Sequence, residues 1–344
     1  MTRRRVLVAL LAAPWVAWAL VRTLALDGGH PLVAAIALTP YVAATAIVPV
    51  LAALVAREWV VAALAALALA ALALAVLPRA LDGPQLAEAE SEGEAETEAE
   101  AEAEARTAAR TLTVMTSNLL HGEADARAVL RIARDHDVDV LSLQELTREA
   151  VERLHAAGAR RLLPRRVLRP APRASGMGLM ARRPLRAAAT PGREIARRLS
   201  AMLALRGGEE LGLVAVHPVP PLSGERTRAW QSVLRGLPDA NAGGRRHVLI
   251  GDFNATLDHR ELRRVLARGY TDAADATGDG LRPTFPVGAP RALLTVDHVL
   301  VPSSIRVRRV SVRDVAGSDH RAVVAELVLP ARLSSTRGRA RRAP

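Results

Sequence analysis

The sequence predicts an α/β domain with mixed sheets that is attached to a membrane by apolar helices. The first 81 residues hold three long apolar stretches. From residue 111 to residue 329, strand-like runs alternate with helix-like runs, as in α/β domains. Acidic, amide and imidazole side chains follow several of these strand-like runs. A chain of 344 residues is long enough for a membrane segment and one domain of ordinary size.

The three apolar stretches are residues 6–26, 32–56 and 59–77. Because a bilayer core of about 30 Å requires about 20 apolar residues in a helix, each stretch is long enough to span it. A signal peptide has a single short apolar core, so three consecutive stretches favour a membrane anchor over a signal peptide with buried helices. We therefore expect three transmembrane helices, with Pro40 and Pro49 inside the second.

Basic residues beside these stretches predict the orientation of the anchor. Residues 3–5 are all Arg, the turn at 27–31 has no Arg, and the second turn has Arg57. Since Arg favours the cytoplasmic side, the N-terminus is expected inside and the large domain outside. Arg79, just after the third stretch, opposes this orientation. We expect a multi-pass protein of the cell membrane whose α/β domain is extracytoplasmic.

Composition divides the chain into an anchor at 1–81, an acidic linker at 82–110, the α/β domain at 111–331 and a basic tail at 332–344. Glu occupies every second position from Glu88 to Glu104, which predicts a solvated spacer because like charges repel. The tail is expected to be disordered. No Cys is present, so disulfides and thiolate metal sites are excluded.

The net charge of +12 comes from 47 basic residues, all of them Arg. A basic surface suits anionic lipid headgroups as well as nucleic acid. Aromatic residues make up only 2% of the chain, which is few for stacking on bases. Charge alone therefore does not indicate a nucleic-acid partner.

The α/β domain is expected to contain at least eight strands and four helices. Expected strands are residues 112–116, 138–143, 178–181, 213–217, 247–250, 295–301, 305–312 and 323–329. Expected helices are residues 124–134, 148–156, 226–234 and 260–267.

The run GDFN at 251–254 follows one strand and carries two polar side chains. Residues two apart in extended chain project to the same side, so Asp252 and Asn254 are expected to face one site. A carboxylate can bind Mg²⁺ or orient an attacking water, and an amide can donate to a phosphoryl oxygen. The alternative is an ordinary turn in which both side chains form local hydrogen bonds.

Five further polar residues follow or precede strands. Glu145 and Asn118 follow strands at the edge where α/β domains bind ligands, although a helix-start Glu and a turn-forming Asn are alternatives. Asp297 could hold His320 in one tautomer, as buried carboxylates do. His217 also ends a strand, where packing is the alternative to catalysis.

These motifs together resemble the endonuclease/exonuclease/phosphatase superfamily, the DNase I-like metal phosphoesterases. The matching motifs are Asn118, Gln144-Glu145, the GDFN run, Asp297-His298 and Ser318-Asp319-His320. The resemblance covers residues 111–329 in the family's order. It implies a four-layer α/β sandwich, with two mixed sheets flanked by helices, and a requirement for Mg²⁺ or Mn²⁺.

The resemblance also implies roles for individual residues. The implied metal ligands are Glu145, Asn118 and Asp319. The implied catalytic residues are Asp252, Asn254, His320, Asp297 and His217. Asp252 would orient or deprotonate water, and Asn254 would hold the phosphate. His320, supported by Asp297, would stabilise the transition state or act as the base. Most relatives carry Asn-Thr before the His at 217, where this chain has Ala-Val.

Three functions remain open. The arrangement of spans, spacer and domain resembles membrane proteins of the VanJ type that confer teicoplanin resistance, which implies a lipid-linked phosphate or polyprenyl pyrophosphate as substrate and the lipid bilayer as partner. The residues of PVPP at 218–221, WQ at 230–231 and TFP at 284–286 add to this likeness. The alternatives are an extracellular nuclease or sphingomyelinase-like phosphodiesterase, and a binding module without activity. Nucleic acid is the less favoured substrate because of the anchor and the few aromatic residues.

Overall fold

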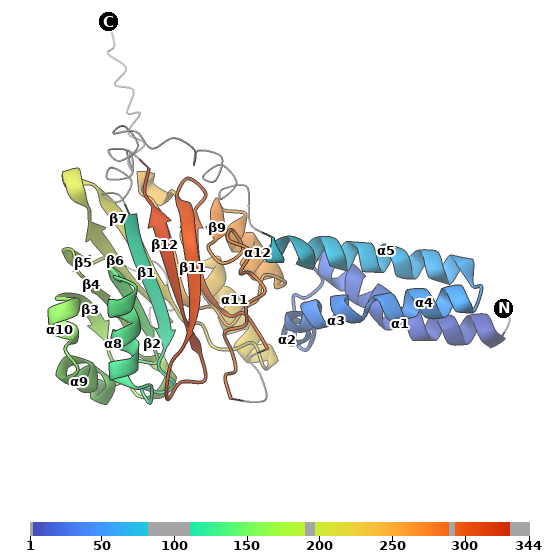
Figure 1. The fold of residues 1–344 in the computed structure, drawn as a ribbon, viewed down its shortest axis with the longest axis horizontal. Coiled ribbons are helices and arrows are strands. Elements are labelled where there is room, and N and C mark those ends of the chain that lie inside the picture. Colours follow the sequence, from blue (N-terminus) through green and yellow to red (C-terminus); the bar gives the residue numbers. More distant parts are fainter. Residues whose placement is uncertain (1–2, 82–110, 190–196, 289–292, 331–344) are drawn as a thin grey trace, which may run out of the picture.

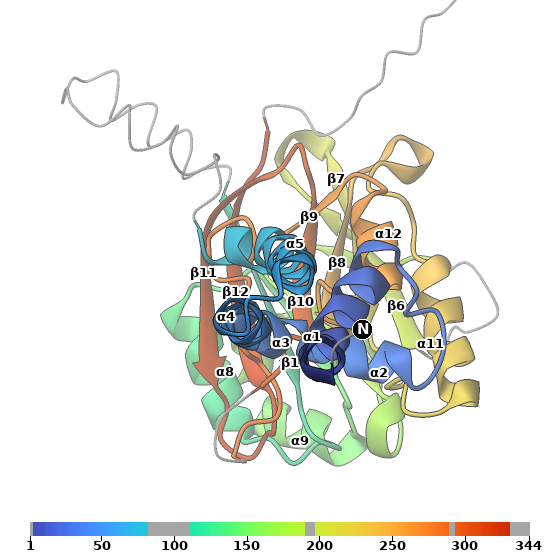
Figure 2. The same ribbon diagram turned by 90° about the vertical axis from the view of Figure 1, so that its right-hand side faces the viewer.

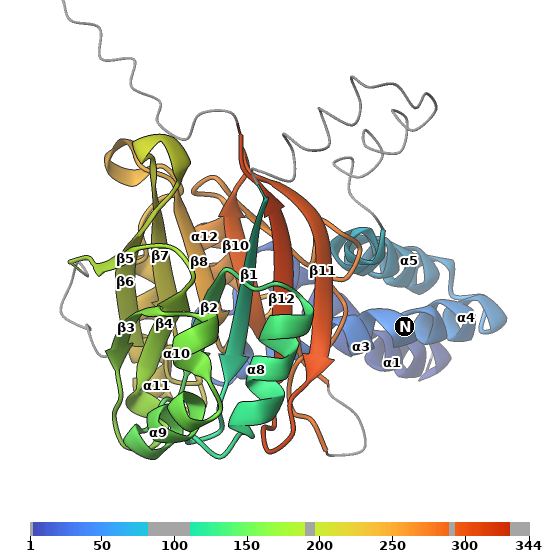
Figure 3. The ribbon, with the colours of Figure 1, turned by 60° about the vertical axis from the view of Figure 1, so that its left-hand side comes forward.

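The computed structural model describes residues 3–81, 111–189, 197–288 and 293–330. The expected acidic linker and basic tail lie outside these residues. The α/β domain consists of two six-stranded mixed sheets packed face to face, with helices on both outer faces (Figures 1 and 3). The predicted four-layer sandwich is therefore confirmed. The apolar helices form a separate bundle that projects from one side of the sandwich (Figure 1).

The first sheet contains β1 and β2, which pair in parallel, and antiparallel neighbours on either side. Consecutive residues of β1 face opposite layers: Val114 packs between the sheets, whereas Met115 packs under the outer helices. Because both faces are covered, β1 is apolar on both sides, as expected for a central strand. In spatial order the strands are β11 (Arg306–Asp314), β12 (Arg321–Val328), β1 (Thr111–Asn118), β2 (Val140–Gln144), β4 (Met177–Ala181) and β3 (Arg165–Arg169).

The second sheet contains β7 and β8 as a parallel pair, and β10 lies antiparallel to β8. Ile250 of β8 packs against the first sheet, and Leu249 packs against the outer helices. In spatial order the strands are β5 (Leu185–Ala187), β6 (Arg198–Ala204), β7 (Glu210–Val216), β8 (His247–Asp252), β10 (Asp297–Pro302) and β9 (Tyr270–Asp272).

Helices complete the outer layers. The side chain of Asp125 accepts a hydrogen bond from the Arg127 amide at the start of α8, and Thr147 and Ser223 cap α9 and α11 in the same way. Helices α8 and α9 cover the first sheet, and α11 and α12 cover the second. The helices are α8 (Ala126–Asp135), α9 (Arg148–Ala156), α10 (Ala159–Leu162), α11 (Gly224–Arg235) and α12 (Arg260–Leu266), with 3₁₀ turns η3 (Arg173–Ser175), η5 (Arg206–Gly208) and η6 (Ala242–Gly244).

The anchor contains two helices that are long and apolar enough to cross a membrane, Arg3–Thr23 and Trp59–Ala80. The second expected span is not one straight helix, because Leu32–Thr45 and Ile47–Val55 meet at a bend of 45°. Pro49 explains the bend, since it cannot donate a hydrogen bond to the carbonyl of Thr45 and its ring crowds that turn. The elements are α1 (Arg3–Thr23), α2 (Leu32–Ala35), η1 (Ile36–Leu38), α3 (Thr39–Thr45), α4 (Ile47–Val55), α5 (Trp59–Val76) and η2 (Leu77–Ala80).

Buried polar contacts join the bundle to the α/β domain. Asp258, whose side chain is fully buried, accepts hydrogen bonds from Arg22 at 2.7 Å and from both terminal nitrogens of Arg79 at 2.8 and 2.7 Å. Asp27 accepts a hydrogen bond from the amide of Arg260 at 2.8 Å. Figure 2, which looks along the bundle, shows it seated over β10 and β12 with α12 beside it. We call this region, around Asp258, the junction.

Candidate active site

Four strands end at one edge of the sandwich and carry the predicted polar residues to it. Asn118 ends β1 opposite Gln144 at the end of β2, and Glu145 follows directly. In the other sheet, Asp252 ends β8 directly opposite Asp297, the first residue of β10. The sequence places carboxylates at strand ends in both sheets, and face-to-face packing of the sheets brings them together.

Asn118, Glu145 and Asp252 face one another across the two sheets. The side-chain amide of Asn118 donates to Glu145 Oε1 at 3.3 Å and to Asp252 Oδ2 at 3.1 Å. All three residues are at most 9% exposed. The carboxylates of Glu145 and Asp252 therefore belong to a single site.

His121 is a neighbour of Glu145 that the sequence analysis did not include in the site. Glu145 Oε2 accepts a hydrogen bond from the backbone amide of His121 at 2.6 Å and lies 2.7 Å from its Nδ1. Both residues have a positive φ, 57° at Glu145 and 53° at His121. Non-glycine residues in this region are uncommon and are held by their surroundings. The side chain of His121 is 49% exposed, so it lies at the rim of the site.

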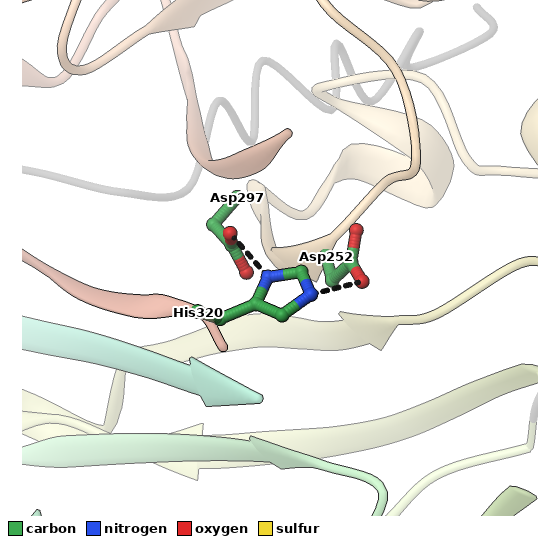
Figure 4. A group of neighbouring side chains, drawn as sticks. All are labelled: Asp252, Asp297 and His320. Atoms are coloured by element: carbon green, nitrogen blue, oxygen red, sulfur yellow. Dashed lines mark hydrogen bonds and ion pairs between the residues drawn. The ribbon is translucent and has the colours of Figure 1, made fainter. Parts of the chain in front are cut away.

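His320 lies between two carboxylates (Figure 4). Its Nδ1 is 2.8 Å from Asp297 Oδ2, and its Nε2 is 3.8 Å from Asp252 Oδ2. The ring of Phe285 packs on the imidazole, with 4.5 Å between the ring centroids. The hydroxyl of Ser318 accepts a hydrogen bond from the His320 amide at 3.0 Å and donates to the carbonyl of Asn118 at 2.8 Å. These contacts fix the imidazole and bring its Nε2 toward Asp252.

The two histidines of the site have opposite charge preferences. Burial opposes protonation of His320, but Asp297 and Asp252 outweigh it and raise its pKa to about 10. Burial lowers the pKa of His217, which Glu145 only partly offsets. Burial also raises the pKa of Asp252, against the effect of His320. The surroundings therefore favour the cationic form of the His320 imidazole and the neutral form of the His217 imidazole.

His217 follows β7 and enters the same site. Its Nε2 lies 3.6 Å from Glu145 Oε1 and 3.5 Å from Asp252 Oδ2. Both distances are longer than an ordinary hydrogen bond, so His217 contacts the two carboxylates without bonding tightly to either. The structure thus places His217 among the predicted site residues despite the unusual residues before it in the sequence.

Asn254 lies beside Asp252 because of a turn, not because of the expected extended backbone. Extended chain ends at Asp252, and Asn254 adopts a left-handed conformation with φ 47°. The backbone N–H of Asn254 donates a hydrogen bond to Asp252 Oδ1 at 2.8 Å. The side-chain nitrogen of Asn254 donates to the carbonyl of Pro218 at 2.9 Å. The two residues are close as predicted, but a turn rather than strand alternation brings them together, as the alternative interpretation anticipated.

Asp319 is partly exposed, with 34% of its side chain accessible. Its Oδ1 lies 4.0 Å from His320 Nε2. Asp297 Oδ1 and Asp319 Oδ1 are both buried without a hydrogen-bond partner among the described residues. An unpartnered carboxylate oxygen is costly, and a bound cation is one way to satisfy it.

The donors of the site fit a divalent metal ion. Carboxylate and amide oxygens are the ligands that hard cations prefer. Ligand atoms of Asp252, Asp297 and His320 also lie within 4.8 Å of one another. Because His320 Nδ1 is already bonded to Asp297 Oδ2 at 2.8 Å, this trio suits proton transfer better than direct metal ligation. The carboxylate of Glu145 is the better candidate. Asn118 supports it, because its side-chain nitrogen donates to Glu145 and Asp252 while its Oδ1 accepts a hydrogen bond from the Leu120 amide at 3.0 Å.

Comparison with solved structures supports the fold. An endonuclease/exonuclease/phosphatase from Beutenbergia cavernae is 19% identical with a TM-score of 0.50, covering 64% of this chain and 72% of that protein. An AP endonuclease from Archaeoglobus fulgidus is 16% identical with a TM-score of 0.52, covering 62% of this chain and 98% of that protein. At these identities the likeness concerns the fold alone. No curated protein sequence matches the chain.

Sequence comparison supplies the family. The profile of the Endonuclease/Exonuclease/phosphatase family matches residues 115–320, which include every residue predicted for the site. Members of this family hydrolyse phosphate esters, and they typically depend on a divalent metal. The chain belongs to the endonuclease/exonuclease/phosphatase family and is a hydrolase of phosphate ester bonds.

Proposed function

We propose that this protein is a membrane-anchored, extracytoplasmic phosphoesterase that depends on Mg²⁺ or Mn²⁺ and hydrolyses a lipid-linked phosphate or pyrophosphate of the polyprenyl type. The proposal combines the family's reaction with the position of the domain on the apolar bundle. A water-soluble polymer such as DNA does not require an enzyme held at a bilayer. A lipid-linked substrate remains in the membrane, so tethering raises its local concentration at the site.

The junction is the observation that carries this proposal. Asp258 is held between Arg22 and Arg79, from the two helices that are long enough to span a membrane. Tyr41 of α3 also donates a hydrogen bond of 2.7 Å to the carbonyl of Leu293, in the segment that leads to Asp297. The anchor thus contacts the same loops that form the site, which supports a substrate delivered from the bilayer.

The side chains of the site can perform phosphate ester hydrolysis together. Glu145 and Asp319, with Asn118 as a supporting residue, would hold a divalent cation, which would neutralise the charge of the phosphate. Asp252 accepts a proton from an attacking water and orients it. The cationic imidazole of His320, held by Asp297, stabilises negative charge that develops on the phosphoryl or leaving oxygen.

The expected orientation is testable with reporter fusions. A phosphatase reporter that requires an oxidising exterior, fused after Leu81, should be active, because the positive-inside rule puts the domain outside. A reporter that is active only in the cytoplasm, fused at the same residue, should be silent. The opposite pair of results would contradict the extracytoplasmic assignment.

The substrate is tested with the full chain purified in detergent micelles. The substrates are polyprenyl pyrophosphate, phospholipid, sphingomyelin and DNA, each with and without EDTA. We expect phosphate release from polyprenyl pyrophosphate that EDTA abolishes. Cleavage of DNA without release of phosphate from the lipid would support the nuclease alternative, and cleavage of sphingomyelin alone would support the phosphodiesterase alternative.

A further inference from the structure

A pocket lies between the apolar bundle and the α/β domain, next to the junction. It encloses about 230 Å³. One wall comes from η1 and α3 of the second apolar stretch, and the opposite wall comes from loops of the α/β domain. The bundle contributes Ala37, Pro40, Tyr41 and Ala44, and the domain contributes Leu257, Leu281, Leu293 and Leu294. The pocket is therefore lined mainly by apolar side chains from both parts of the protein.

One corner of the pocket is polar, and its charged side chains already bond to each other. Arg79 and Asp258 line it, and they form the bidentate ion pair of the junction. Their polar atoms are committed to each other and to Arg22. A ligand in this pocket is consequently recognised by its apolar surface rather than by hydrogen bonds.

The domain segment that lines the pocket at residues 293–295 continues directly into the active site. Thr295 lines the pocket and is two residues from Asp297, so their Cα atoms lie no more than about 7 Å apart. Leu294 also pairs with Phe285 through backbone hydrogen bonds of 2.9 and 2.7 Å. Phe285 in turn packs on the imidazole of His320. Through this segment the pocket therefore adjoins the residues that hold His320.

Several residues that line the pocket are exposed at its rim. Tyr41 is 43% exposed and Leu293 is 46% exposed, although both line the pocket. Ala44 is also exposed. Large exposed apolar residues on α3 and α4 continue away from the domain, including Ile47, Val48 and Leu51. This surface suits lipid rather than water, because contiguous exposed apolar patches mark membrane or partner contacts.

We propose that this pocket binds the hydrocarbon segment next to the phosphate of a lipid-linked substrate, and so selects lipid phosphates over chainless ones. The inference rests on the proposed function. The volume sets the length of the segment: a cavity of about 150 Å³ already holds benzene, so 230 Å³ accommodates a few carbon atoms more and not a whole polyprenyl chain. The remainder of the chain would follow the exposed apolar surface of α3 and α4.

The test fills the pocket without changing the site. Ala44→Phe places a ring in the pocket from an exposed position on α3. Ala70→Phe makes the same change at an exposed position on α5, away from the pocket, and is the matched control. The full-length variants are assayed in micelles with isopentenyl, geranyl and farnesyl pyrophosphate and with bis-p-nitrophenyl phosphate. Thermal melting of both variants confirms that they fold alike.

The unchanged chain and Ala70→Phe should hydrolyse farnesyl pyrophosphate with a kcat/KM at least about tenfold above that for isopentenyl pyrophosphate, since each buried CH₂ adds to binding. Ala44→Phe should reduce this ratio to about one or two and leave bis-p-nitrophenyl phosphate hydrolysis unchanged. If Ala44→Phe keeps the full ratio, the pocket inference is wrong while the proposed function stands. If the unchanged chain cleaves bis-p-nitrophenyl phosphate but no prenyl pyrophosphate, the pocket inference and the proposed lipid-linked substrate are both wrong.

Discussion

Replacement of Asp258 by Asn tests whether the junction holds the anchor and the α/β domain together. The Asp258 side chain is fully buried and accepts three hydrogen bonds of 2.7–2.8 Å from Arg22 and Arg79. Asn has nearly the same shape but no charge, so two largely buried guanidinium groups lose their counter-ion. Removal of one partner from a buried ion pair costs about 3–5 kcal/mol.

This loss is large enough to measure by thermal melting. At about 2–4 °C per kcal/mol for a domain of this size, Asp258→Asn should lower the Tm by about 6–20 °C. Asp314→Asn is the control, since Asp314 forms an ion pair of similar length with Arg321 (2.7 Å) but is 73% exposed. Exposed pairs contribute about 0–1 kcal/mol. Equal melting temperatures of the two variants in the same micelles would refute the role given to the junction.

The pH dependence of this difference gives a second readout. Burial alone would raise the pKa of Asp258, but Arg79 and Arg22 hold it below its ordinary value. A lowered pKa in the folded state means that the stabilisation is present above the ordinary pKa of about 3.9 and is lost as pH falls through the lowered value. The gap in Tm between the unchanged chain and Asp258→Asn should therefore be constant from about pH 5 to 8 and narrow only below about pH 4. A gap that closes near neutral pH would contradict this account.

Three further predictions concern the site. Asp297→Asn should lower kcat by about 10²- to 10⁴-fold with little change in KM, because it removes the carboxylate that orients His320 and stabilises its charge; a kcat within a few fold of the unchanged chain would contradict this role. EDTA should abolish hydrolysis of bis-p-nitrophenyl phosphate, and added Mg²⁺ or Mn²⁺ should restore it, whereas turnover that persists in EDTA would exclude a metal-dependent reaction. Gly251→Ala should destabilise the domain by about 1–3 kcal/mol or more in thermal or chemical unfolding, because a Cβ there would lie 2.1 Å from the carbonyl oxygen of Val216, whereas Gly29→Ala, with open space around it, should not.

The sequence was most informative where a local pattern decides the structure. Asp252 and Asp297 each adjoin an apolar run, and an apolar strand at this position in an α/β domain carries its neighbours to the functional edge. All four expected helices of the domain are present, and α9 has the expected bounds, because a capping residue such as Thr147 marks the start of the helix. The family resemblance then indicated which strand ends meet.

The parts that the sequence did not predict depend on contacts between distant residues. Strand β6 was not predicted, because its residues are mainly Arg, Leu and Ala, which have little preference for strand. Its extended conformation depends on pairing with β5 and β7. Phe285 packs on His320 because a loop of the second sheet crosses to the end of the first, a contact that no local pattern shows. His121 was not included in the predicted site, and its contact with Glu145 arises from left-handed backbone at both residues.

The central claim is that Glu145 and Asp319, supported by Asn118, hold a divalent ion beside Asp252 and that the reaction requires this ion. The most direct test is the Mg²⁺ dependence of bis-p-nitrophenyl phosphate hydrolysis by the unchanged chain, Glu145→Gln and Asp297→Asn. Glu145→Gln should raise the half-saturating Mg²⁺ concentration at least about tenfold, since it removes a charged ligand. Asp297→Asn should reduce kcat at an unchanged half-saturating concentration. A Glu145→Gln variant with the metal dependence of the unchanged chain would contradict the claim.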